Sequence, residues 1–177
     1  MVIMINGSFG IGKTTVARML RRALPGSLIY DPEWFGIALM RLGKVFRIRR
    51  WETDDFQNIP LWRRSLCAGV RLFGRFASGP VIVPMTFSSR EYFDEVLSGL
   101  RNQGSQPRVF CLAANLETIE RRLASRLNRS ENEGNWLARR IRECVEAHRN
   151  AHFGESVATE NRTARDVADE ILNRLRC

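Results

Sequence analysis

The strongest chemical pattern in the sequence is a glycine-rich run that ends in a lysine and a threonine. The run GSFGIGKT, residues 7–14, satisfies GxxxxGK[ST] and stands between a short apolar run and a helical pattern. Its glycines let backbone N–H groups face inward, and the dipole of the following helix points its positive end at the same place. Lys13 can reach the β- and γ-phosphates of ATP, and the Thr14 hydroxyl can hold Mg²⁺. We therefore predict an ATP-binding phosphate loop made of Gly7, Ser8, Phe9, Gly10, Ile11, Gly12, Lys13, Thr14 and Thr15.

Two other interpretations of this run are weaker. A GxGxxG dinucleotide loop does not fit, because that fingerprint expects a ribose-binding acid after the second strand and has no use for a Lys-Thr pair. A glycine-rich turn without function is disfavoured, because Lys13 is one of only two lysines among 28 basic residues.

Carboxylates that could work on a hydroxyl group follow the loop in the sequence. Asp31 ends the second apolar run and precedes Pro32, which is typical of a helix N-cap with proline at the first helical position. Ligands of doubly wound sheets bind beyond the strand ends, so Asp31 is also a candidate to accept a hydroxyl proton, to contact substrate, or to hold Mg²⁺ with Thr14. Asp54 and Asp55 are either loop acids that are solvated or cap a local turn, or contacts to substrate or metal. The general base stays open among Asp31, Asp54 and Asp55.

Two arginines are candidates for a lid. Arg122 and Arg126 are four residues apart in a helical pattern and so share one face, ahead of a polar loop predicted at 127–135. In a phosphotransferase such arginines stack on adenine and clamp the transferring phosphoryl group. The alternative is that both arginines belong to a solvated basic helix face. Because a phosphate loop is present, we favour nucleotide binding. Three catalytic residues are therefore predicted, namely Lys13, Asp31 and Arg126.

Aromatic residues crowd into residues 32–77, which we interpret as an acceptor-side insertion. Aromatics interleaved with arginines suit a pocket for a ligand with apolar and polar parts. The substrate candidates here, besides the acids, are Trp34, Phe35, Phe56, Trp62 and Arg63. His148 and His152 lack further metal ligands nearby in the sequence and are interpreted as surface residues.

Strand and helix patterns alternate along the chain. Short apolar runs predict strands at 1–5, 27–31, 81–85, 108–113 and 157–159, and periodicity predicts helices at 13–23, 90–102, 116–127, 136–151 and 164–175, with another opening at Pro60. Alternation of this kind predicts an α/β fold with a five-stranded parallel sheet flanked by helices on both faces.

Composition limits the class of protein further. The 177 residues, 44% of them hydrophobic, suit a single domain, 1–177, and no run is long enough to span a bilayer. The net charge of +9 suits an anionic ligand, but no base-reading module accompanies it, so a nucleic-acid partner is not expected. Four cysteines far apart are interpreted as reduced thiols of a cytoplasmic protein.

The sequence resembles the ATP-binding tunicamycin-resistance protein family, which is similar to small P-loop kinases of the nucleoside-monophosphate, shikimate and chloramphenicol phosphotransferase type. The resemblance covers nearly the whole chain and rests on INGSFGIGKT, YDPEWFGIAL, DDFQNIPLWR, VIVPMTFSSREYFDEVLSGLR, ETIERRLASR and NWLARRIRECVE.

This resemblance implies a three-layer P-loop kinase fold, ATP and Mg²⁺ as cofactors, and tunicamycin or a similar lipid-tailed nucleoside as partner. Stable membrane insertion is not expected, because no run is long enough to span a bilayer. It implies either a phosphotransferase acting on a hydroxyl of the antibiotic or a nucleotide-gated protein that sequesters it. One departure concerns the third strand, where VIVPMTFSS supplies Thr86 but no carboxylate for Mg²⁺.

Overall fold

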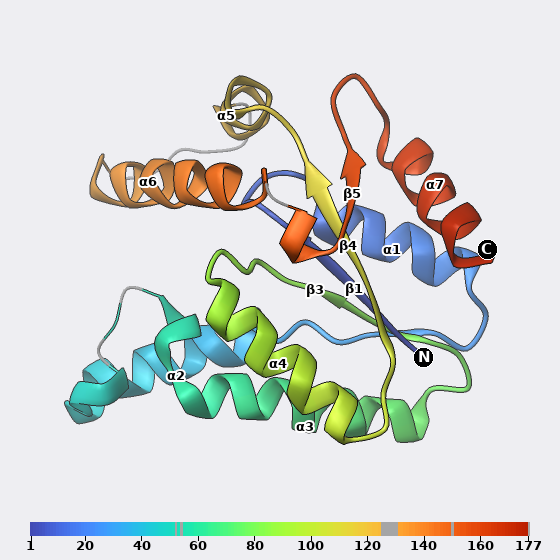
Figure 1. Cartoon of the computed structure of the whole chain (residues 1–177). Helices are drawn as coiled ribbons and strands as arrows, with labels where there is room; N and C mark the ends of the chain where they lie inside the picture. The colour runs from blue at the N-terminus through green and yellow to red at the C-terminus, as the bar shows by residue number, and fades with distance from the viewer. Residues whose placement is uncertain (52, 54, 125–130, 150, 177) are drawn as a thin grey trace.

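A five-stranded parallel sheet forms the middle layer of the computed structural model (Figure 1). The structure describes residues 1–177 except 52, 54, 125–130, 150 and 177. The strands are β1 (Val2–Gly7), β2 (Leu28–Ile29), β3 (Val81–Pro84), β4 (Pro107–Ala113) and β5 (Glu155–Ala158). They lie in the order β2-β3-β1-β4-β5, and every neighbouring pair is parallel. The predicted α/β fold with a five-stranded parallel sheet is confirmed.

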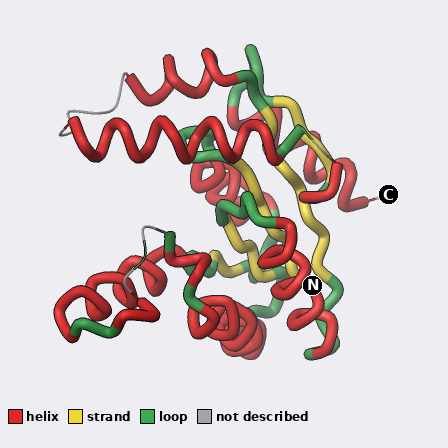
Figure 2. Tube along the Cα trace, turned by 60° about the vertical axis from the view of Figure 1, so that its left-hand side comes forward, coloured by secondary structure: helices red, strands yellow, loops and turns green. Residues whose placement is uncertain are grey.

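Helices cover both faces of this sheet (Figures 1 and 2). They are α1 (Lys13–Ala23), α2 (Glu33–Phe46), α3 (Pro60–Phe76), α4 (Arg90–Asn102), α5 (Leu116–Ala124), α6 (Glu131–Ala147) and α7 (Ala164–Arg176), with single turns η1 (Arg49–Trp51), η2 (Phe56–Asn58) and η3 (Ala151–Phe153). Within the described part of the chain, no helix combines the length and apolarity needed to cross a membrane.

The core lies on both sides of β1, the central strand. Successive side chains of a strand point to opposite faces, so Val2 and Met4 join a cluster with α3 and α4, whereas Ile3 and Ile5 join one with α1 and α7. Burial on both faces explains why β1 is an uninterrupted apolar run. The free thiols of Cys67, Cys111 and Cys144 are buried in these clusters or beside them, in agreement with the interpretation as reduced cysteines.

Most predicted elements agree with the structure, and α6 is the main exception. The helices at 13–23 and 90–102 have the predicted bounds, and α3 begins at Pro60 as expected. Helix α6 begins at Glu131, five residues before its predicted start, so residues 131–135 of the predicted lid loop are helical, and 127–130 lie outside the described residues. Polarity suggested a loop there, but glutamate is a good helix former and acids near a helix start complement its dipole.

Residues 32–77 connect β2 to β3 through α2, η1, η2 and α3. This excursion stands on the same side of the sheet as α4 (Figure 1) and begins where β2 ends. It therefore brings the first residues of α2 to the carboxyl edge of the sheet, where the glycine-rich loop also lies.

Candidate nucleotide and acceptor site

The glycine-rich loop connects the end of β1 to the start of α1. Gly10 and Gly12 have φ values of +76° and +109°, in the left-handed region that favours glycine. Gly12 is the N-cap of α1, and no side chain caps this helix. The first N–H groups of α1 are therefore available to an anion, with the positive end of the helix dipole behind them.

Lys13 lies inside this loop. Its Nζ donates to the carbonyl oxygens of Gly7 and Ser8, at 3.0 Å each, and the residue is 9% exposed. Burial lowers the pKa of Lys13, whereas the charges of Glu33 and Asp31 raise it. A buried ammonium that is hydrogen-bonded to backbone carbonyls, and whose pKa responds to two carboxylates, is suited to exchange those carbonyls for phosphate oxygens.

Glu33 is a functional candidate that the sequence analysis missed. It is the first residue of α2, and its carboxylate accepts a hydrogen bond of 3.2 Å from the Thr86 hydroxyl, just beyond β3. Burial raises the pKa of Glu33, against the opposite effect of Lys13. The carboxylate absent from the third-strand segment is thus supplied by α2, and its only sequence signal is its place two residues after Asp31.

Asp31 lies beside this pair and combines the two roles left open by the sequence. Its Oδ1 accepts a hydrogen bond of 3.0 Å from the backbone N–H of Glu33, as a capping carboxylate does. Pro32 takes the N-cap position instead of the first helical position, so α2 begins one residue later than expected. Burial raises the pKa of Asp31, which is half-buried.

The oxygen atoms around Lys13 fit a magnesium ion bound together with nucleotide phosphates. Thr14 is exposed at the start of α1, and Asp31 and Glu33 provide carboxylates. Among the described residues, no three or more acidic, histidine or cysteine side chains form a cage for a metal. Mg²⁺ commonly binds through one or two carboxylates plus phosphates and water, so a full protein cage is not required.

Arg122 connects α5 to the glycine-rich loop. Its guanidinium donates to Thr159 Oγ1 at 3.1 Å, to the Thr159 carbonyl oxygen at 2.7 Å and to the Ile11 carbonyl oxygen at 3.4 Å. These residues border a cavity of about 160 Å³ that also includes Gly12 and Thr15. Arg122, which the sequence predicts to bind the nucleotide, therefore lies next to the loop. Arg126 falls outside the described residues.

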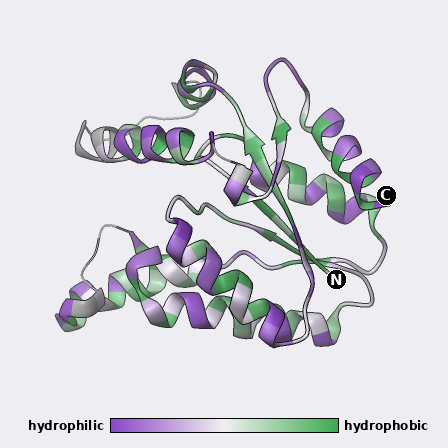
Figure 3. Cartoon of the chain, viewed as in Figure 1, coloured by the Kyte–Doolittle hydropathy of each residue, from purple (hydrophilic) through white to green (hydrophobic). Residues whose placement is uncertain are grey.

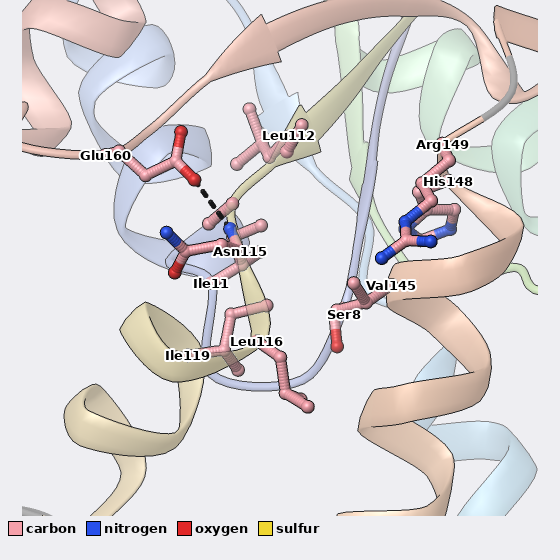
Figure 4. A pocket seen from close by; sticks show the side chains of 12 residues that line it. Ser8, Ile11, Leu112, Asn115, Leu116, Ile119, Val145, His148, Arg149 and Glu160 are labelled. Atoms are coloured by element: carbon pink, nitrogen blue, oxygen red, sulfur yellow. Dashed lines mark hydrogen bonds between the residues drawn. The ribbon is translucent and has the colours of Figure 1, made fainter.

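A second cavity of about 290 Å³ opens between α5, α6 and the tip of β4 (Figure 4). Ser8 lines it together with Leu112, Ile119 and His148. The Ser8 hydroxyl is buried and has no hydrogen-bond partner in the described structure. The phosphate loop thus carries an unsatisfied polar group, as expected of a loop that completes its hydrogen bonds on a ligand.

An ion pair joins α6 to the segment of residues 32–77. Arg140 of α6 binds the carboxylate of Asp55, next to η2, and its Nη2 donates to Ser88 Oγ at 3.2 Å. The two side chains are 11% and 14% exposed, and the Nε of Arg140 is buried without a partner. Asp55 also accepts from the backbone N–H of Gln57, so this acid is a structural anchor as well as a substrate candidate. Asp54 lies outside the described residues.

The Arg140–Asp55 pair gives a stability prediction. Arg140→Met and Asp55→Asn each lower the free energy of unfolding by about 1–3 kcal/mol, because each removes one side of a largely buried ion pair. The double variant loses less than the sum, by about 1 kcal/mol. Urea unfolding measures all three, with the exposed Arg149→Met as control, for which about 0.5 kcal/mol or less is expected. Strictly additive losses would show that the two side chains are not coupled.

The aromatic substrate candidates fall into two groups. Trp62 is fully buried with its indole N–H donating to the Pro32 carbonyl at 2.8 Å, and Phe56 packs on it at 4.8 Å between ring centroids. Trp34 and Phe35 are 79% and 42% exposed. The structure thus brings Phe56 and Trp62 together in the core and leaves Trp34 and Phe35 on the surface.

Arg63 also lies inside the molecule. It is 8% exposed, pairs with Glu95, donates to the Gln57 carbonyl and stacks over Tyr92. These contacts to Glu95, Gln57 and Tyr92 support a structural role for Arg63 in the fold.

The interpretation of His148 as a surface residue is wrong. The imidazole is half-buried, with Nε2 2.6 Å from the Phe87 carbonyl oxygen and 3.3 Å from Asn6 Nδ2, and burial lowers its pKa. His152 pairs with Asp94 at 3.1 Å. The four-residue spacing carried no information on packing, because α6 ends at Ala147 and neither histidine belongs to the helix.

The sheet order, the glycine-rich loop and the carboxylates beyond β2 define a kinase-like, nucleotide-binding P-loop fold. Residues 2–151 match the family model described as AAA domain, and the chain belongs to this family. A search of curated proteins finds no match.

Solved structures with similar folds agree with this assignment. The structure of the Deinococcus radiodurans tunicamycin resistance protein is similar with a TM-score of 0.78 and 27% identity, covering 99% of this chain and 95% of that one. A gluconokinase from Sinorhizobium meliloti 1021 (TM-score 0.63, coverage 99% and 95%) and a shikimate kinase from Acinetobacter baumannii in complex with shikimate (TM-score 0.60, coverage 98% and 92%) are each 16% identical and show the fold alone. The resemblance to tunicamycin-resistance proteins is thereby confirmed as full-length similarity.

Proposed function

We propose that this protein is an ATP- and Mg²⁺-dependent phosphotransferase that acts on a hydroxyl group of tunicamycin or a similar lipid-tailed nucleoside. The observation that carries the proposal is the buried lysine of the glycine-rich loop, Lys13, whose pKa responds to the charges of Asp31 and Glu33 at the start of α2. The name of the Deinococcus radiodurans neighbour supports the choice of drug.

Each group has a distinct role in this proposal. The glycine-rich loop and Lys13 bind the phosphates, Arg122 and Arg126 border the nucleotide, and Thr14 with Asp31 or Glu33 would hold Mg²⁺, which neutralises phosphate charge when bound. A carboxylate takes the proton of the acceptor hydroxyl. Burial raises the pKa of both Asp31 and Glu33, which makes either a better base near neutral pH. Residues 32–77 form the acceptor side, where Trp34 and Phe35 offer exposed rings.

Mass spectrometry of the drug tests the proposal. Protein, Mg-ATP and a molar excess of tunicamycin are incubated, and the drug is expected to gain one phosphoryl group. Lys13→Ala is the control and should leave the drug unchanged. Unmodified drug that is bound at about one molecule per chain would overturn the enzymatic proposal in favour of sequestration.

A further inference from the structure

Exposed apolar side chains gather on α2. Trp34, Phe35, Ile37, Leu42, Val45 and Phe46 are between 42% and 79% exposed, and they are six of the ten large exposed apolar residues in the described part of the chain. At 3.6 residues per turn, one side of α2 carries Trp34, Ile37, Arg41, Leu42, Lys44 and Val45, which we call the α2 outer face. This face runs along a helix about 21 Å long.

Close packing on the opposite side of α2 prevents the helix from burying this face by rotation. A Cβ atom at Gly36 would lie 2.8 Å from Trp62 Nε1, and one at Gly43 would lie 2.6 Å from Trp51 Cβ. Leu39 is buried between these two contacts. Only the glycine side can approach the body so closely, so the α2 outer face is held toward solvent.

The charged residues between Trp34 and Trp51 are all basic. Residues 34–51 carry Arg41, Lys44, Arg47, Arg49 and Arg50 and no acidic residue. Arg41, Lys44, Arg47 and Arg49 are exposed, and the one acid of α2, Glu33, points to Thr86. Exposed apolar and basic residues therefore alternate along α2, and Figure 3 shows hydrophobic and hydrophilic residues mixed along this helix.

We propose that the α2 outer face docks on the surface of an anionic lipid bilayer. A helix with exposed tryptophan and aliphatic residues beside arginine and lysine is suited to lie in the headgroup region, with its apolar side chains in the acyl boundary and its cations on lipid phosphates. The net charge of +9 attracts the whole chain to such a surface. A symmetric dimer through the same face is disfavoured because it would bring two sets of these cations together.

Docking in this orientation does not require ATP binding, although Trp34 belongs both to the α2 outer face and to the proposed acceptor side. Helix α2 is part of the proposed acceptor-side segment, so a bilayer on its outer face would lie next to that segment. Helix α7 lies on the other side of the molecule (Figure 1). ATP binding depends on the glycine-rich loop and does not require this face.

Flotation of the full chain with lipid vesicles tests the proposal. We expect binding to vesicles of phosphatidylglycerol mixed with phosphatidylcholine, and little binding to phosphatidylcholine alone. Two double variants, Trp34→Ser with Val45→Ser and Arg41→Gln with Lys44→Gln, should each weaken binding on the order of tenfold or more. The matched control is Phe76→Ser, because Phe76 is 77% exposed at the end of α3 remote from α2. The control should bind like the unmodified chain.

Three results would overturn the proposal. The first is no preference for anionic vesicles, and the second is equal binding by all variants. The third is a concentration-dependent dimer, seen by light scattering, that the Trp34→Ser and Val45→Ser double variant abolishes; this result would assign the face to a second copy. ATP affinity is measured for every variant and should not change, so a failure of vesicle binding is distinguishable from a failure of the proposed phosphotransfer.

Discussion

Replacing Lys13 with alanine should remove nearly all measurable ATP binding while the fold persists. The lysine is the one cation that the structure places inside the glycine-rich loop among the described residues, and its Nζ now binds only the carbonyl oxygens of Gly7 and Ser8. Loss of such a donor in a water-poor site lowers phosphoryl transfer by about 10²-fold or more. Because burial lowers the pKa of Lys13, the folded protein is penalised for holding this charge, and its removal should not lower the thermal midpoint.

A fluorescent ATP analogue and calorimetry measure the two quantities separately. Lys44→Ala is the matched control, because Lys44 is the other lysine of the chain and is exposed on α2. It should bind ATP like the unmodified protein. Unchanged ATP affinity in Lys13→Ala would refute the assignment of the phosphate loop.

The second large effect is expected for Glu33→Gln, which should lower phosphoryl transfer by about 10²-fold. Glutamine keeps the hydrogen bond with Thr86 but cannot accept a proton or hold a metal ion as a carboxylate does. At neutral pH the same variant should not lower the thermal midpoint, because burial disfavours the ionised form of the Glu33 carboxyl.

The free energy of unfolding should depend on pH through Glu33, and the direction of this dependence follows from its raised pKa. The folded pKa of Glu33 is raised by burial above its ordinary value of 4.5, so the folded protein keeps the proton where the unfolded chain has lost it. The free energy of unfolding contributed by Glu33 therefore falls as pH rises from about 4.5 through the raised pKa. Glu33→Gln should remove that part of the decline, and it also removes the effect of the Glu33 charge on the pKa of Lys13.

Two further variants complete this experiment. Asp31→Asn preserves the capping hydrogen bond to Glu33 N, so its stability should stay within about 0.5 kcal/mol, while transfer falls because the carboxylate is lost. The exposed Glu91→Gln, in the first turn of α4, is the control and should change neither quantity. Full transfer by Glu33→Gln would reduce Glu33 to a partner of Thr86 and leave the base among Asp31, Asp54 and Asp55.

The parts of the protein that depend on neighbours in the sequence could be predicted. Residues 7–14 form a loop whose glycine positions and following helix are fixed within one short segment. The buried strands are apolar on both faces and therefore appear in the sequence as short apolar runs. The alternation of these runs with helical patterns predicted the parallel sheet. Asp31 was found because it directly follows such a run.

The rest depends on residues that meet only when the chain has folded. Glu33 meets Thr86 across 53 positions and Arg140 meets Asp55 across 85, and no local pattern encodes either distance. The aromatic segment illustrates the same limit: Trp62 and Trp34 have one residue type, yet the first is fully buried and the second 79% exposed. The crowding of aromatic residues placed both in an acceptor-side segment, but the close contacts of Gly36 and Gly43 decided which side of α2 faces the core. Sequence therefore determined the phosphate loop and the sheet, whereas tertiary packing decided which carboxylates join the loop and which apolar side chains remain in solvent, because both depend on long-range contacts.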